Sequence, residues 1–143
     1  MFVLKWVVLA WVGLTLPLSV HAKAENPVVL VVGDSLSAGY GVAVDSTWVA
    51  LLQQRLATQG YGYRVVNASI SGDTTGAARA RLPRALELHQ PAIVILELGG
   101  NEGLRGLPLP QVRENFQFLI ERAQAAGAKV VVVCMRMPPN YGA

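Results

Sequence analysis

Three short polar segments carry the side chains of this sequence that could do chemistry. They are GDS at residues 33–35, SGD at residues 71–73 and GGN at residues 99–101. A serine hydroxyl becomes a nucleophile when a base removes its proton, and acyl transfer also needs hydrogen-bond donors for the oxyanion that develops. Ser35 offers the hydroxyl, and donors could come from its own N–H group, from the Gly72 N–H group and from the Asn101 amide. Together the segments indicate nucleophilic acyl transfer.

Taken one at a time, the same segments are typical of ordinary turns, since Gly, Asp, Asn and Ser are common turn residues. The elements around them decide between the two interpretations. Runs rich in Val, Ile and Leu predict buried strands at residues 28–32, 63–67, 92–98 and 129–135. Helical periodicity predicts helices at about residues 47–59, 74–82, 83–89 and 110–126.

Capping residues and proline set the expected ends of these helices. Asp45 or Ser46 is expected to cap the first helix, and Gly60 to follow its last turn. Pro83 is expected at the first turn of the helix over residues 83–89, where proline is well tolerated. The residues between the third strand and Pro110 are expected to form a loop.

Strands that alternate with helices predict right-handed βαβ units, and hence an α/β fold with a parallel sheet between two layers of helices. In such sheets, functional sites lie at the carboxyl ends of the strands. The three polar segments follow the first, second and third predicted strands, so all three are expected at this edge. The loops that enter the strands are short and plain. Function is therefore predicted at one edge of the sheet.

Composition narrows the class of protein. The chain has 143 residues, enough for one domain, and with 52% hydrophobic and 15% charged residues it is too apolar for a disordered protein. Its net charge is only +3 and no basic stripe is interleaved with aromatic residues, which argues against nucleic-acid binding. Two histidines and one cysteine provide no metal-binding cluster. Cys134 lies in the run VVVVCM and is expected to be a small buried residue.

Residues 1–22 are typical of a secretory signal peptide. Lys5 precedes an apolar stretch over residues 7–20, and small residues at 20–24 offer cleavage positions. The stretch is short and interrupted by Pro17, which disfavours a stable membrane span, although an uncleaved anchor stays an alternative. The sequence thus predicts export, to a periplasm or outside the cell, of a domain over residues 27–143.

The polar segments lie in longer blocks that resemble the GDSL, or SGNH, family of serine hydrolases. The blocks are VVGDSLSAGYG at 31–41, NASISGDTT at 67–75 and LELGGNEGLRG at 96–106, and the likeness covers residues 27–142. The resemblance implies a three-layer α/β/α, flavodoxin-like fold and no metal or organic cofactor. It implies a small-molecule ester or thioester substrate with its acyl group in an apolar cleft, and hence arylesterase, acyl-CoA thioesterase or lysophospholipase activity.

The resemblance also assigns roles to individual residues. It implies that Ser35 is the nucleophile and that Gly72 and Asn101 form the oxyanion hole. Asp34 would hold the turn through local hydrogen bonds, and Glu102 stands where this subgroup commonly has Asp, beside the hole. Four leucines are candidates for the wall of the acyl cleft, although packing on the core explains them equally well: Leu36, Leu104, Leu107 and Leu109.

The family's base, an Asp-x-x-His motif near the C-terminus, is not found in this sequence. His89 is predicted at the opposite edge of the sheet from Ser35, a strand length of ~20 Å away, whereas a base must lie within ~3 Å. Lys129 also enters a strand at that edge, and Tyr40 is a poor base at neutral pH. Glu97, inside a strand, is expected to make a structural hydrogen bond.

These observations predict a chain that is incomplete at its C-terminus relative to the family, with the last strand and helix missing. The fourth strand would then be an apolar edge, and the 143-residue chain would have low activity. An alternative is a non-catalytic remnant of the same fold that binds acyl chains or carbohydrate. A nucleotide-binding domain is disfavoured, because GDSLSAG matches neither G-x-G-x-x-G nor G-x-x-x-x-G-K-[ST].

Overall fold

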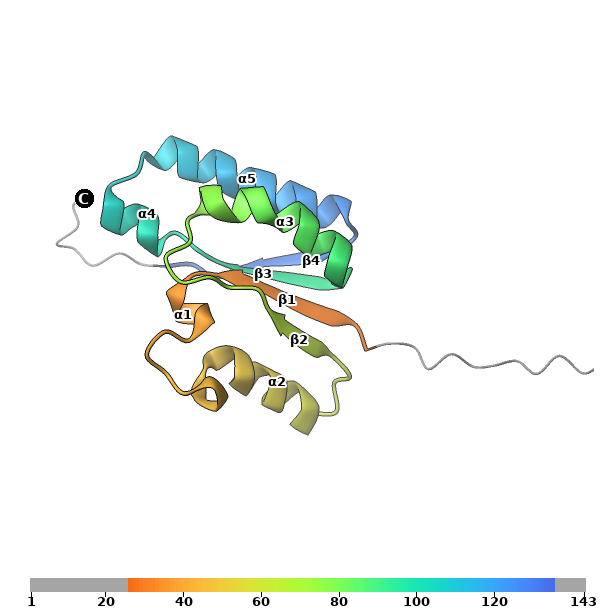
Figure 1. The fold of residues 1–143 in the computed structure, drawn as a ribbon. Coiled ribbons are helices and arrows are strands. Elements are labelled where there is room, and N and C mark those ends of the chain that lie inside the picture. The colour runs from red at the N-terminus through yellow and green to blue at the C-terminus, as the bar shows by residue number, and fades with distance from the viewer. Residues whose placement is uncertain (1–25, 136–143) are drawn as a thin grey trace, which may run out of the picture.

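A sheet of four parallel strands forms the centre of the computed structural model, which describes residues 26–135 (Figure 1). The strands are β1 (Val28–Gly33), β2 (Arg64–Asn67), β3 (Ile93–Glu97) and β4 (Lys129–Val132), in the order β2-β1-β3-β4. The four predicted strands and the α/β class are confirmed. The predicted signal peptide and the loop after residue 135 lie outside the described residues.

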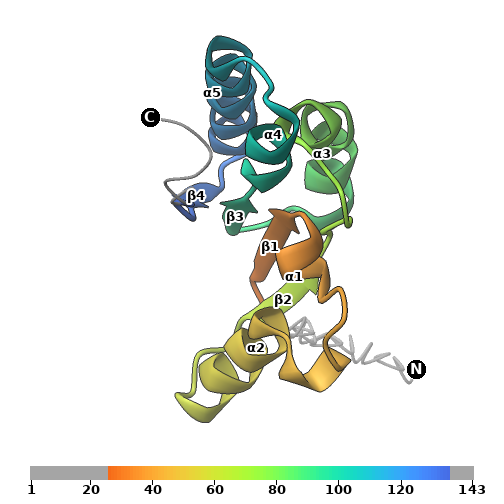
Figure 2. The same ribbon diagram turned by 90° about the vertical axis from the view of Figure 1, so that its left-hand side faces the viewer.

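Helices cover both faces of the sheet, so the predicted three layers are confirmed (Figure 1). One layer holds α1 (Ser35–Ala38), a 3-10 turn, η1 (Val44–Ser46), and α2 (Trp48–Thr58). The other holds α3 (Thr75–His89), α4 (Gly100–Arg105) and α5 (Leu109–Ala125). Figure 2 turns the carboxyl edge of the sheet toward the viewer and shows α1 beside the end of β1 and α4 next to β3.

The core lies mainly between the sheet and the layer of α3 and α5. The buried side chains of this cluster include Leu30, Val32, Val94, Leu96, Leu82 and Leu119. Val29 and Val31, whose side chains lie on the other face of β1, are also buried, and so is Val49 of α2 on that side. Because both faces of β1 and β3 are covered, their sequences are almost continuously apolar, as is typical of parallel strands.

The expected break at Pro83 is wrong, because α3 runs without interruption from Thr75 to His89. Proline removes one backbone hydrogen bond from the middle of a helix, which normally kinks or ends it. Here Leu82 and Leu86, on either side of Pro83, are both buried in the core cluster. Packing of these neighbours against the sheet and α5 holds the two halves of the helix in line.

Two further details of the helices differ from expectation. The cap of α2 is Thr47, whose Oγ1 accepts a hydrogen bond from the Ala50 N–H group at 3.2 Å, while Asp45 and Ser46 lie in η1. The segment after β3 is partly helical, because Gly99 turns the chain with φ +114° and α4 begins at the next residue. Gly60, with φ +77°, follows the C-cap residue Gln59 of α2, which confirms the predicted helix end.

The prediction that Cys134 is buried is wrong, since this side chain is exposed. β4 ends at Val132, and in the part of the chain that the structure describes β4 is the last strand of the sheet. Val131, Val132 and Val133 are between 40% and 48% exposed, so the run VVVV forms the predicted apolar edge. Within residues 26–135, no helix is both long and apolar enough to cross a membrane.

Candidate active site

The first site residue, Ser35, lies where β1 gives way to α1. β1 ends at Gly33, Asp34 caps the helix, and Ser35 is the first helical residue. Asp34 Oδ1 accepts a hydrogen bond from the Leu36 N–H group at 3.0 Å, which confirms the predicted local role of this carboxylate. The first N–H groups of a helix have no partner within the helix. The Ser35 N–H group has no acceptor among the described residues and stays free for an anion.

Gly72 lies in the loop after β2, in a tight turn that requires φ +84°. The next residue, Asp73, donates its N–H group to the Ile70 carbonyl at 3.1 Å, whereas the Gly72 N–H group finds no acceptor within residues 26–135. Arg81 fixes this loop through a 2.7 Å bond from its Nε atom to Asp73 Oδ2 and a second bond to the Ala68 carbonyl. The loop is therefore held rigidly around a free donor.

Asn101, the second residue of α4, brings the Ser35 turn and the Gly72 loop to one point. Its Nδ2 atom donates to the Asp73 carbonyl at 2.8 Å and to Asp34 Oδ2 at 3.3 Å. One amide group thus touches residues adjacent to both Ser35 and Gly72. All three predicted site residues therefore lie together at the carboxyl edge of the sheet, as the order of the strands predicts.

The arrangement can stabilise a negative charge that develops beside the Ser35 hydroxyl. Two backbone N–H groups, those of Ser35 and Gly72, are unpaired in the described chain. The Asn101 amide holds Asp34 only by its longer bond, which a stronger acceptor can replace. An oxyanion hole requires several donors of this kind at one place.

Arg105 and Glu102 support this edge from α4, and the sequence alone did not reveal how. The Arg105 guanidinium donates to the Gly72 carbonyl at 3.0 Å. Glu102 is 3% exposed, and its Oε1 atom accepts a hydrogen bond from the Thr75 N–H group at the start of α3. A carboxylate is favoured at the N-terminus of a helix, because it satisfies a free donor and complements the helix dipole. Glu102 therefore ties α4 to α3 beside the site.

The candidate bases lie where the sequence predicts. His89 ends α3 and lines a hollow with Asn26 and Val28 at the start of β1, whereas Ser35 follows the end of β1. Lys129 begins β4 at the same distant edge, and Tyr40 is 80% exposed. Within the described chain, no histidine reaches Ser35. Residues 26–135 also contain no group of three or more His, Cys, Asp or Glu side chains placed to hold a metal ion.

Glu97, the last residue of β3, makes the structural hydrogen bond that the sequence predicts. Its Oε2 atom accepts a bond of 2.6 Å from the Ser37 hydroxyl. Burial raises the pKa of the Glu97 carboxyl above its usual 4.5, and the nearby Asp34 carboxylate raises it further, while the Ser37 hydrogen bond lowers it in part. The net direction is upward.

This raised pKa predicts a pH-dependent stability. The folded chain binds the Glu97 proton more tightly than the unfolded chain does, so the associated stability is present below pH 4.5 and is lost as pH rises through the folded-state pKa. Glu97→Gln removes the titration. We therefore expect the difference in unfolding free energy, Glu97→Gln minus the unmodified chain, to become larger as pH rises from 4 to 7. Urea titrations at each pH measure this difference. Glu87→Gln, at an exposed carboxylate, is the matched control, and a flat difference for Glu97→Gln would contradict the prediction.

Two hollows adjoin the carboxyl edge. One, of about 430 Å³, is lined by Leu36, Trp48, Glu97, Val133, Cys134 and Met135. The other, of about 570 Å³, lies between α4, α5 and the end of β4 and includes Leu107 and Leu109 in its wall. Three of the four predicted wall leucines therefore line these hollows. Leu104 lines neither and is 63% exposed.

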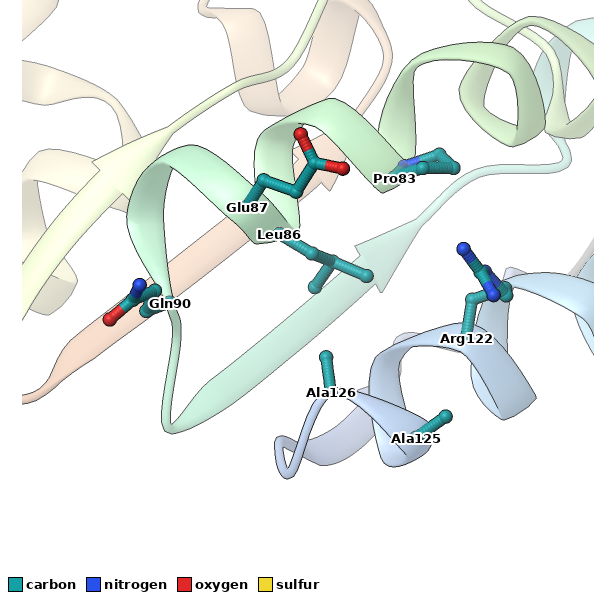
Figure 3. Close-up of a pocket in the computed structure, with 7 residues that line it drawn as sticks. All are labelled: Pro83, Leu86, Glu87, Gln90, Arg122, Ala125 and Ala126. Carbon is teal, nitrogen blue, oxygen red and sulfur yellow. The ribbon is translucent and has the colours of Figure 1, made fainter.

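Another hollow, of about 480 Å³, also lies away from the candidate site. Figure 3 shows Leu86 of α3 and Arg122 of α5 on its two sides. It involves the C-terminal halves of both helices, which lead to the starts of β3 and β4. It is therefore at the opposite end of the strands from Ser35, and we assign it no part in the chemistry.

Comparison with known proteins identifies the family of this chain. The chain matches the GDSL-like Lipase/Acylhydrolase family over residues 31–143, and it belongs to this family. Esterase TesA of Pseudomonas aeruginosa is 52% identical over 120 residues, which cover 84% of this chain and 60% of that protein. Thioesterase 1/protease 1/lysophospholipase L1 of Escherichia coli strain K12 is 42% identical over 129 residues, which cover 90% of this chain and 61% of that protein.

A solved structure supports the same fold. The esterase AlinE4, described as a member of the SGNH-hydrolase family, is 39% identical and has a TM-score of 0.79. The match covers 85% of this chain and 66% of that chain. The SGNH-hydrolase fold expected from the motifs is therefore confirmed. The chain spans about 60% of the length of the curated relatives that it matches.

Proposed function

We propose that this protein is a serine hydrolase that cleaves carboxylic esters or acyl thioesters through an acyl-enzyme on Ser35. The observation that carries the proposal is the Asn101 amide, which binds Asp34 and the Asp73 carbonyl at once and so gathers the Ser35 turn and the Gly72 loop. The names of the relatives, an esterase and a thioesterase/lysophospholipase, support the same chemistry.

In the proposed reaction, Ser35 Oγ loses its proton to a base and attacks the acyl carbonyl carbon. The N–H groups of Ser35 and Gly72 and the Asn101 amide hold the resulting oxyanion. The tetrahedral intermediate collapses, the alcohol or thiol leaves with a proton, and water then hydrolyses the acyl-serine by the reverse proton transfers. The base is the Asp-x-x-His histidine implied by the family, which the 143-residue sequence does not contain.

The hollow beside Leu36 suits the acyl part of such a substrate. It begins at the residue after the proposed nucleophile, and apart from Glu97 and Cys134 its wall is formed by Leu36, Trp48, Val133 and Met135. An apolar wall binds an acyl chain by removing its surface from water. We therefore propose small-molecule esters and thioesters with an aliphatic acyl chain as substrates.

We also propose export through the apolar leader at residues 1–22. Cleavage of a tagged precursor, followed in bacterial fractions, would test this proposal.

A fluorophosphonate probe tests the nucleophile. We expect slow but selective labelling of Ser35 in the 143-residue chain, because the phosphoryl oxygen can occupy the same three donors. Peptide mass spectrometry should place the adduct on Ser35, and Ser35→Ala should remove it. Labelling that spreads over exposed serines, or no labelling on long incubation, would instead favour a module that only binds acyl chains or carbohydrate.

A further inference from the structure

Ser37 is a buried hydroxyl that the proposed reaction does not use. It lies two residues after Ser35 in α1 and is 0% exposed. α1 has only four residues, and a helix so short cannot hold its own conformation, because one turn of hydrogen bonds does not repay the entropy of ordering it. The position of Ser35 must therefore be fixed by contacts between α1 and the rest of the fold.

Ser37 makes those contacts with the ends of all three strands that lead to the site. Its hydroxyl donates to Glu97 Oε2, at the end of β3, over 2.6 Å. Its carbonyl accepts a bond of 2.7 Å from Asn67 Nδ2, at the end of β2. At the end of β1, a Cβ atom on Gly33 would lie 2.6 Å from Ser37 Oγ, so only glycine leaves room for the hydroxyl. The three strand ends thus meet on one residue.

The contacts that stabilise the Glu97 carboxylate come from α1 and its cap. The residue is 5% exposed, and its Oε1 atom has no hydrogen-bond partner among residues 26–135. The titratable groups that the described elements bring near it are Asp34, which caps α1, and Cys134, which lines the same hollow. Neither compensates a buried carboxylate, which within the described chain is stabilised by the Ser37 hydroxyl and, more weakly, by the backbone of Asp34 and Ser37.

We infer that Ser37 and Glu97 form a positioning pair that fixes the Ser35 hydroxyl relative to the oxyanion hole. The inference rests on the proposed function for the role of Ser35. Glu97 lines part of the acyl hollow and Ser37 is fully buried, so neither member of the pair touches the reacting atoms. Their bond joins α1 to β3, and β3 leads through Gly99 into the helix that carries Asn101. This buried contact thereby links the turn that carries the nucleophile to the segment that carries the oxyanion donor.

Reaction rates are sensitive to such positioning, since a displacement of ~1 Å can reduce a rate by ~100-fold. The test compares Glu97→Gln, whose amide oxygen still accepts from Ser37, with the double variant Ser37→Ala/Glu97→Met. Removing both polar partners avoids leaving a buried carboxylate unpaired, so the double variant is expected to fold. Glu87→Gln, on the exposed face of α3, is the control.

Two readouts are needed. The first is hydrogen exchange of the Ala38 and Gly39 amides, which bond to the Asp34 and Ser35 carbonyls. We expect their protection to fall at least tenfold in the double variant, while the Leu51 amide of α2 keeps its protection. The second is the rate of Ser35 labelling by fluorophosphonate. We expect it to fall at least tenfold in the double variant and to stay within about twofold in Glu97→Gln.

The two readouts separate the inference from the proposed function. Unchanged exchange and unchanged labelling in a folded double variant would overturn the positioning pair, and so would an equal loss in Glu97→Gln. If Ser35 fails to react in every variant, the proposed function is wrong, and the exchange measurement alone still decides whether the pair anchors α1. Loss of Ala38 and Gly39 protection together with slower labelling, rescued in Glu97→Gln, would establish the pair.

Discussion

We expect ester hydrolysis to rise by about 10⁴-fold or more when the 143-residue chain is extended after Ala143. The added segment is the part of the Pseudomonas aeruginosa esterase TesA that lies beyond the matched region. Loss of the histidine of a catalytic triad typically lowers kcat by factors of this size, and the remaining activity comes from the oxyanion hole and substrate binding. The sequence has only two histidines. His89, the one that the structure describes, lies at the opposite edge of the sheet from Ser35.

Hydrolysis of p-nitrophenyl butyrate, measured for both polypeptides at equal concentration, checks this prediction. The fusion with Ser35→Ala is the control for contaminating esterases and is expected to fall to background. A second control removes the histidine of the Asp-x-x-His motif that the family resemblance implies for the added segment. If the 143-residue chain alone matches the fusion, a base for Ser35 exists that the described residues do not reveal, and the proposed division of roles is wrong.

In the active fusion, Asn101→Ala is expected to lower kcat by about 10²- to 10³-fold with a small change in KM. This is the usual effect of removing one oxyanion-hole donor, because the donor binds the charge that exists only in the transition state. The same substitution breaks the bonds to Asp34 and the Asp73 carbonyl, so part of the effect could come from a displaced loop.

A matched variant separates these two causes. Arg105→Gln removes the bond from the guanidinium to the Gly72 carbonyl and so loosens the same loop without removing a proposed donor. We expect Arg105→Gln to lower kcat by less than about tenfold. An equal effect of the two substitutions would show that Asn101 acts by holding the loop, and steady-state kinetics with a p-nitrophenyl ester series would detect it.

The sequence predicts the sheet and the place of the site well because both follow from short-range patterns. Apolar runs mark strands that are buried on both faces, and the order of strands and helices puts Ser35, Gly72 and Asn101 at one edge. What it does not predict depends on contacts distant in the chain. The bond from Ser37 to Glu97 joins residues 60 positions apart, and nothing in either local segment reveals the partner.

The errors have the same origin. Pro83 is expected to interrupt a helix, but packing of Leu82 and Leu86 in the core decides otherwise. Cys134 is expected to be buried because it follows an apolar run, yet the run forms an edge of the described sheet. An apolar sequence indicates that a segment tends to be buried. Whether it is buried depends on the elements that the fold places beside it.

Because β1 pairs in parallel with two other strands, the reactivity of Ser35 can report on the folding of the sheet. β1 pairs with both β2 and β3, and Val29 of β1 lies opposite Val65 of β2 and Ile93 of β3. These contacts join distant parts of the chain. Such contacts form slowly, because long loops must close first. Helix signals in circular dichroism can therefore recover early during refolding, while Ser35 becomes reactive only when the three strands have docked. Pulsed labelling of this serine would time the assembly of the central sheet.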